Sequence, residues 1–245
     1  MKEQVRHLLN YRTAFGDLII VIVGVLIALA VDSWWEEREN RLEEAAHVAA
    51  LKAEAEQNLV ELYATVADIE RYTASTRALI EIVEGSREVP PSETLVELTW
   101  ESFSYGAFDP QFTAYDNLLG TGGTRLLSDE KLKRDLARFR ASVDGLTRLD
   151  WVLDQWNRQI QPWVVMNLEL DWLPETYRNE RQLPDPAVPT NWAAVLNDRE
   201  FKGIVINRLI AFDDYMLGLS RIVPVAEALA DRLGVNVEEI RDKGI

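Results

Sequence analysis

Carboxylates are the side chains of this sequence that are best suited to chemistry. Three pairs of Asp lie near one another in the sequence and suit general acid–base catalysis or metal binding: Asp109 with Asp116, Asp150 with Asp154, and Asp213 with Asp214. Only Asp150 and Asp154 have the spacing that places two side chains on one helix face. Because the chain holds 41 acidic residues, we expect such pairs on the solvated surface or at helix caps. We therefore predict no catalytic site and expect that the protein is not an enzyme.

Other reactive groups are scarce. The sequence has no Cys and two His, His7 and His47, which excludes thiolate chemistry, disulfides and Cys/His zinc sites. The turn at Gly120–Thr124 lacks the preceding strand and the following Lys-Ser/Thr of a phosphate-binding loop. A formal net charge of -15 repels nucleic-acid phosphates. We predict no metal, no cofactor and no nucleic-acid partner.

Tryptophan is the more informative residue type. Six of the eight Trp lie beyond residue 35: Trp100, Trp151, Trp156, Trp163, Trp172 and Trp192. Such a cluster could line a pocket or a groove for a partner, and the residues we single out for that role are Trp151, Asp154, Trp156 and Trp163. Packing of these rings in the core is the competing interpretation.

An uncharged run near the N-terminus predicts a membrane anchor. Leu18–Val31 contains no polar residue, and the segment 14–35 has the 22 residues that a helix needs to cross about 30 Å of hydrocarbon. Trp34 and Trp35 suit the headgroup layer at its end. We predict a short basic tail at 1–13, a transmembrane helix at 14–35 in contact with the lipid bilayer, and an extramembrane domain at 36–245.

Two other interpretations of this run stay open. The basic residues before Arg12 and the triplet Ala28-Leu29-Ala30 are compatible with a cleaved signal peptide, and a buried core helix has similar length. Lys and Arg are equally frequent on the two sides of the run, so orientation rests on Arg12 before it and on acidic residues after it. We expect a bacterial inner-membrane protein with a cytoplasmic N-terminus and a periplasmic domain.

One stripe of the predicted anchor suits contact with another helix. Its residues are spaced by three or four positions: Asp17, Val21, Gly24, Ala28 and Val31. Gly24 and Ala28 form a small-x-x-x-small pair, which lets two backbones approach closely. We predict a homo-oligomer or contact with other membrane-protein subunits. The alternative is that Gly and Ala are simply common in membrane helices.

The anchor is expected to continue as a long helix to about residue 84, because neither Gly nor Pro occurs between Val25 and Glu84. A heptad-spaced seam follows its length: Leu59, Leu62, Val66, Ile69, Thr73, Thr76, Ile80 and Val83. An earlier part of the same pattern is Val48, Leu51 and Ala55. This seam must be buried, either by later helices of the chain or by a second copy.

Further helices are predicted at about 92–120, 129–172 and 191–233, and strand-like alternation is nearly absent. We expect Ser92, Asp109, Asn191 and Asp198 to act as N-caps, and Ser128 with Asp129 and Glu130 to open the long helix between them. Inward positions of the last long helix are expected at Ile204, Leu209, Phe212, Met216, Leu219 and Val223. Pro162 should kink or restart its helix, Pro224 should end the last run, and 174–189 should be a loop. The predicted fold is all-α, a transmembrane helix continuing into a helical bundle.

Two segments resemble an uncharacterised family of small single-pass bacterial membrane proteins. The first is Gly16-Asp17, the Ile/Val/Gly run that closes on Ile27-Ala28-Leu29, then Trp34 and Glu36-Glu37-Arg38. The second contains Phe108-Asp109-Pro110, Tyr115, Leu118, Gly122 or Gly123, and Leu126-Leu127. The resemblance covers about a quarter of the chain, and Asp32-Ser33 and Trp35 depart from it. It implies a single-pass anchor with a helical domain, and it does not imply any biochemical activity.

These patterns predict a membrane-anchored scaffold or interaction subunit that self-associates or belongs to a larger inner-membrane complex. The alternative is an extracytoplasmic sensory module that binds a small ligand and signals through a partner.

Overall fold

This computed structural model describes the backbone of residues 2–243 and the side chains of residues 19–147, 158 and 160–242. The protein is 79% helical, and no strand occurs in the described backbone. The predicted all-α fold is therefore confirmed.

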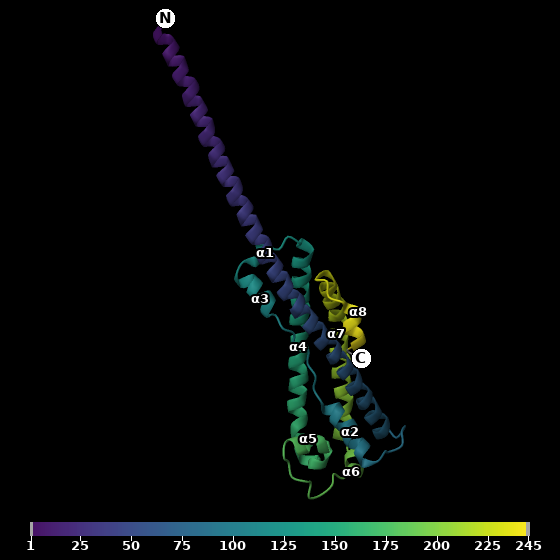
Figure 1. Cartoon of the computed structure of the whole chain (residues 1–245). Coiled ribbons are helices and arrows are strands. Elements are labelled where there is room, and N and C mark those ends of the chain that lie inside the picture. The colour runs from purple at the N-terminus through teal and green to yellow at the C-terminus, as the bar shows by residue number, and fades with distance from the viewer. Residues whose placement is uncertain (1, 244–245) are drawn as a thin grey trace.

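The dominant element is a single helix, α1 (Lys2–Val83), of 82 residues. At about 1.5 Å per residue it is roughly 120 Å long. It ends where Gly85 adopts a positive φ of 74° and the amides of Gly85 and Ser86 donate to carbonyls of Ile82 and Glu81. Figure 1 shows that its N-terminal half projects well beyond the rest of the chain.

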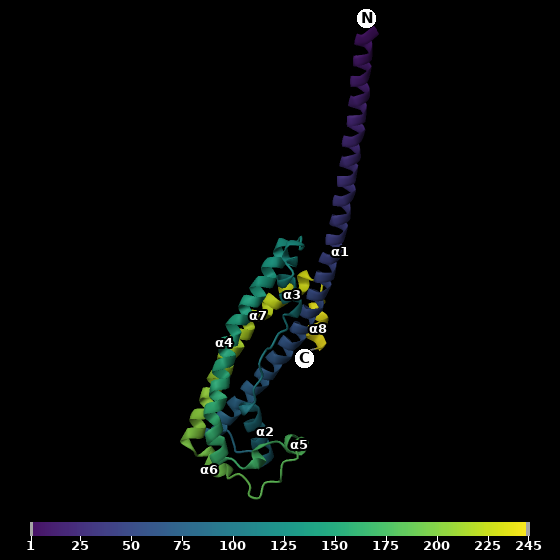
Figure 2. The same ribbon diagram turned by 90° about the vertical axis from the view of Figure 1, so that its left-hand side faces the viewer.

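The C-terminal half of α1 forms a bundle with two other long helices, α4 (Glu130–Asn167) and α7 (Arg199–Arg232). Helix α7 packs against both α1 and α4, so it is the central member (Figure 2). The shorter helices lie around these three: α2 (Ser92–Phe103), α3 (Thr113–Gly120), α5 (Glu175–Glu180), α6 (Trp192–Leu196) and α8 (Val237–Lys243). Two 3-10 turns cover Gly123–Arg125 and Leu170–Trp172.

The seam of α1 is buried by helices of the same chain. Leu59, Leu62 and Ile69 are fully buried, as the heptad pattern predicts. Beyond Leu62, Ile69 and Thr76 are buried as predicted, but four other buried positions precede the predicted ones by one residue. Thr65, Tyr72, Leu79 and Ile82 lie inside, whereas Val66, Thr73, Ile80 and Val83 are half-buried. The prediction was wrong at those four positions, one of which is taken by the polar Thr65. The hydroxyls of Thr65 and Thr76 donate to carbonyls one turn earlier, which satisfies them inside the core.

The core face of α7 shows the same shift. Its buried positions recur every four and three residues: Phe201, Val205, Arg208, Phe212, Tyr215, Leu219, Ile222, Ala226 and Leu229. Phe212 and Leu219 are confirmed as inward residues. Ile204, Leu209, Met216 and Val223 are only half-buried. The apolar pattern misplaced the face because Arg208 occupies one of its positions.

Neither internal proline ends its helix. Helix α4 continues past Pro162 to Asn167, so it does not restart there, and α7 continues past Pro224 to Arg232, so the predicted end at Pro224 is wrong. Both prolines are exposed. Water can therefore bind the carbonyl that each proline leaves without its amide partner.

The predicted helix starts are partly correct. The side chains of Asp129, Asn191 and Asp198 accept bonds from the first-turn amides of α4, α6 and α7. Ser92 is the first residue of α2 and does not cap it. Asp109 does not cap α3 either, because that helix begins later, at Thr113.

Some predicted helix bounds differ as well. The element expected at 129–172 ends as an α-helix at Asn167, and the one expected at 191–233 is two helices, α6 and α7. The expected loop at 174–189 contains α5, and α8 was not predicted. Short helices with few apolar residues give little periodic signal.

Candidate functional site

The first candidate site is the apolar part of α1. Val21 and Val31 are exposed to 61% and 58%, Ala28 is exposed, and a Cβ placed on Gly24 would meet nothing within 4 Å. The stripe therefore has no partner within the described chain. Asp17, its first predicted member, has a side chain outside the described residues. By length and hydropathy this helix could cross a membrane, and its apolar window is 0% buried.

The aromatic pair that follows is also free. Trp34 and Trp35 are exposed, and their ring centres lie 6.3 Å apart in an edge-on arrangement. The Arg38 guanidinium lies 6.0 Å from the centre of the Trp34 ring. An indole with a cation beside it suits a lipid headgroup layer.

Trp163, which was predicted to line a pocket or groove, lies in the core instead. Trp163 is 5% exposed, stacks on Phe201 at 5.2 Å between ring centres, and its indole N–H donates to Asp198 at 3.1 Å. It is therefore a core residue with a satisfied polar atom. The side chains of Trp151, Asp154 and Trp156 lie outside the described residues.

Other rings of this region do gather at the end of the bundle away from the N-terminus. Trp172 lies 5.9 Å from Trp100 and 6.0 Å from Phe103 between ring centres. A hollow of about 290 Å³ opens beside them, lined by Phe103, Ile160, Gln161, Val164 and Trp172.

Two of the paired aspartates form ordinary surface contacts with arginines. Asp213 forms an ion pair with Arg77 at 3.0 Å, and Asp116 lies 3.7 Å from Arg140. Asp150 lies outside the described side chains. Among the described residues, no group of three or more His, Cys, Asp or Glu is arranged to hold a metal ion.

The glycine-rich turn has a structural explanation. Gly122 has a φ of 73°, and a Cβ on Gly123 would come within 3.0 Å of the His47 Nε2 atom. These glycines let the turn before α4 pack closely against α1.

The second candidate site is one that sequence reasoning missed. The chain between α2 and α3, residues 104–112, runs extended along α1, and we call it the crossover. Side chains of α1 form hydrogen bonds with the backbone of the crossover. Asn58 accepts from the amide of Gln111 and donates to its carbonyl, both at 2.8 Å, and Glu61 accepts from the amide of Asp109 at 2.9 Å. On the other side, the Phe108 amide donates to the hydroxyl of Tyr215 in α7 at 2.9 Å. The crossover therefore joins α1 to α7.

Each end of the crossover meets a charge that suits the adjoining helix terminus. At the start of α3, Glu54 accepts from the amides of Ala114 and Tyr115, at 2.6 and 3.3 Å. At the end of α2, Arg208 donates to the carbonyls of Ser102, at 2.8 Å, and of Ser104. An anion at a helix N-terminus and a cation at a C-terminus both interact favourably with the helix dipole.

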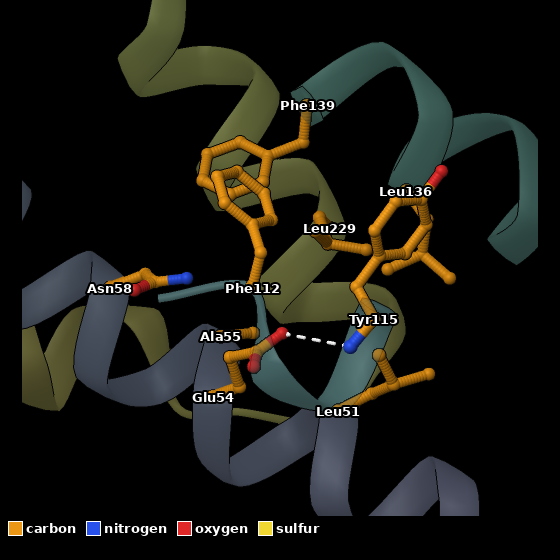
Figure 3. A pocket seen from close by; sticks show the side chains of 9 residues that line it. All are labelled: Leu51, Glu54, Ala55, Asn58, Phe112, Tyr115, Leu136, Phe139 and Leu229. Carbon is orange, nitrogen blue, oxygen red and sulfur yellow. Dashed lines mark hydrogen bonds between the residues drawn. The ribbon is translucent and has the colours of Figure 1, made fainter. Parts of the chain in front are cut away.

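Glu54 borders a small cavity between α1, α3, α4 and α7 (Figure 3). Its volume of about 10 Å³ corresponds to a single water at most, so it holds no ligand. Burial raises the pKa of the Glu54 carboxyl, while the two amides that it accepts from lower it.

Arg208 is the least expected residue of the core. It is 1% exposed and its guanidinium carbon lies 4.4 Å from the centre of the Phe212 ring. No ion pair with a carboxylate is found for it among the described residues. Burial lowers the pKa of Arg208 to about 10, so the side chain stays charged at neutral pH. A sequence signal did exist, since Arg208 falls in the four-and-three spacing of α7, but an apolar count excludes it.

Comparisons of the chain with family models, with curated proteins and with solved structures found no match.

We predict that Arg208→Met lowers the free energy of unfolding by about 2–4 kcal/mol. The change leaves two carbonyls at the buried end of α2 without their charged donor. Urea denaturation followed by circular dichroism measures this. As a control, Arg77→Met removes an exposed ion pair, for which a loss of no more than about 1 kcal/mol is expected. Equal losses in the two variants would contradict the role of Arg208.

We also predict a pH-dependent difference between the wild type and Glu54→Gln. Because the pKa of Glu54 is raised in the folded protein above its ordinary value of 4.5, its contribution to stability is present below pH 4.5 and is lost as the pH rises through the folded pKa. The unfolding free energy of the wild type minus that of Glu54→Gln should therefore fall as the pH rises above about 4.5. A difference that stays constant with pH would argue against this.

Proposed function

We propose that this protein is a membrane-anchored helical scaffold or interaction subunit, which self-associates or belongs to a larger membrane complex. One observation carries the proposal. The apolar segment of α1 from Ile19 to Trp35 contacts no other described part of the chain, yet it continues without interruption into a packed bundle. A long helix that is apolar on all sides requires an apolar environment from outside the chain.

The competing interpretations of this segment differ in what they require. A soluble core helix would be buried, whereas the apolar window of α1 is 0% buried. A cleaved signal peptide would be absent from the mature protein, so the mass of the mature chain distinguishes it from an anchor.

The anchor would hold the bundle close to the membrane surface. The amide of Ser128, just before α4, donates to the Glu44 carboxylate. Glu44 lies nine residues after Trp35, or about 14 Å along a helix at roughly 1.5 Å per residue. Such a short helical connection suits a subunit whose domain is held at a fixed distance from the membrane surface.

The proposed location is the bacterial inner membrane, with the N-terminus in the cytoplasm and the bundle in the periplasm. Its support is the basic tail ending at Arg12 and the acidic residues Glu36 and Glu37 at the other end of the span.

A second candidate function is a sensory module that binds a small ligand. The observation in its favour is the aromatic hollow beside Trp172, whose volume of about 290 Å³ lies at the lower limit for ligand pockets. The exposed apolar segment of α1 is stronger support than this hollow, because it is a continuous surface that requires an apolar partner.

The proposal predicts specific crosslinking through the anchor stripe. Since the chain has no Cys, the variant Gly24→Cys carries a single thiol, and we expect oxidation of native membranes to link it to a second copy or to one defined membrane protein. Ile22→Cys, on the opposite side of the helix, is the matched control and should react much less. Monomeric chain in both variants, or loss of the segment from the mature protein, would contradict the proposal.

A further inference from the structure

Helix α1 carries an exposed apolar face that continues from the anchor into the bundle. At about 3.6 residues per turn, residues 18 apart lie in line along a helix, as do Gly24, Leu42 and Val60. Leu42 is 65% exposed and Val60 is 49% exposed. Exposed alanines lie on this side between Leu42 and Ala53, and the turn between Ala53 and Val60 carries the exposed Glu56 and Gln57. The segment that we call the outer face consists of Leu42, Ala46, Ala49, Ala53 and Val60.

The outer face points away from the core of the bundle. The buried residues of the same helix, Leu51, Leu62 and Ile69, lie on its opposite side. Figures 1 and 2 show α1 on the outside of the bundle, with α3 and α8 on its two flanks. All members of the outer face are exposed, so no described residue covers them.

We propose that the outer face binds the same face of a second copy, with the two α1 helices parallel. This inference rests on the proposed function, because a shared membrane anchor gives both copies the same direction. Alanines allow two helix backbones to approach closely, and Leu42 and Val60 supply the larger apolar contacts. A surface that matches itself is what a two-fold dimer requires.

Charges along the two edges of the outer face determine the direction of pairing. Near the anchor, one edge carries Glu39 and Glu43, whereas the other carries Arg38 and Arg41. Further along the second edge, Lys52 donates to the Gly234 carbonyl at 2.6 Å, and the exposed Glu56 follows it. In a parallel two-fold pair, each edge meets the opposite edge of the partner helix, so acidic residues face basic ones. An antiparallel pair would bring like charges together. The charge pattern therefore favours a second copy in parallel orientation.

Single-cysteine crosslinking of the full-length chain in native membranes tests this inference. We expect Ala53→Cys and Val60→Cys to form adducts of twice the chain mass of 28.0 kDa. The matched control is Ala137→Cys, on the exposed side of α4, and it should form at least tenfold less of this adduct. The double variant Ala53→Glu/Val60→Glu should abolish the dimer in detergent, whereas Ala137→Glu should not. Circular dichroism establishes that both charged variants fold.

The outcomes separate this inference from the proposed function. If Gly24→Cys forms adducts but Ala53→Cys and Val60→Cys react no more than Ala137→Cys, the outer face is not an interface, while the anchor contact stands. Adducts of the outer face with a protein of different mass would also overturn the second copy as its partner. If no position forms an adduct, both proposals fail.

Discussion

The structure depends on one constraint: a single helix must satisfy two different environments along its length. From Ile19 to Trp35, α1 exposes apolar side chains all round, whereas beyond Leu51 it buries only one seam against the bundle. Between these parts, residues 36–43 are exposed and gain no support from packing. Their helix is favoured by sequence, with no Gly or Pro and an ion pair between Arg41 and Glu37. It is also favoured because helix on both sides removes the nucleation cost.

The bundle is held to α1 by polar contacts as well as by its apolar core. Glu54 and Arg208 bind the two helix ends that adjoin the crossover, and Asn58 and Glu61 bind its backbone between them. An extended segment has backbone amides and carbonyls that need partners when they are buried. Side chains of α1 and α7 supply those partners, so the crossover fixes how these two helices sit along each other.

The sequence allowed the fold class, the long first helix and much of the core to be predicted. Leu51, Leu59 and Leu62 follow from apolar spacing alone. Part of the later α1 seam did not, since Thr65, whose hydroxyl bonds to its own helix, is a core residue there. Arg208 was missed for a related reason, since an apolar count excludes a charged residue even where its spacing places it on the core face. No local pattern predicts that Glu54 reaches an amide 60 residues later in the chain.

The candidate sites show the same difference between features set by local sequence and features set by tertiary packing. The anchor stripe and the Trp34–Trp35 pair depend on local sequence, and the structure leaves all their described members exposed. The groove expected at Trp163 depends on tertiary packing, and there the ring is buried. The exposure of residues in the N-terminal apolar segment was therefore easier to predict than the packing of rings from distant parts of the chain.

The central claim is that anchor and bundle are joined by one continuous helix. Electron paramagnetic resonance tests this directly, with spin labels on the two cysteines of an Ile27→Cys/Ala50→Cys variant, diluted with unlabelled chain in lipid nanodiscs. These positions are 23 residues apart, so a continuous helix predicts a narrow distribution near roughly 35 Å. A broad distribution, or a mean distance well below this value, would show that the helix is broken between membrane and bundle.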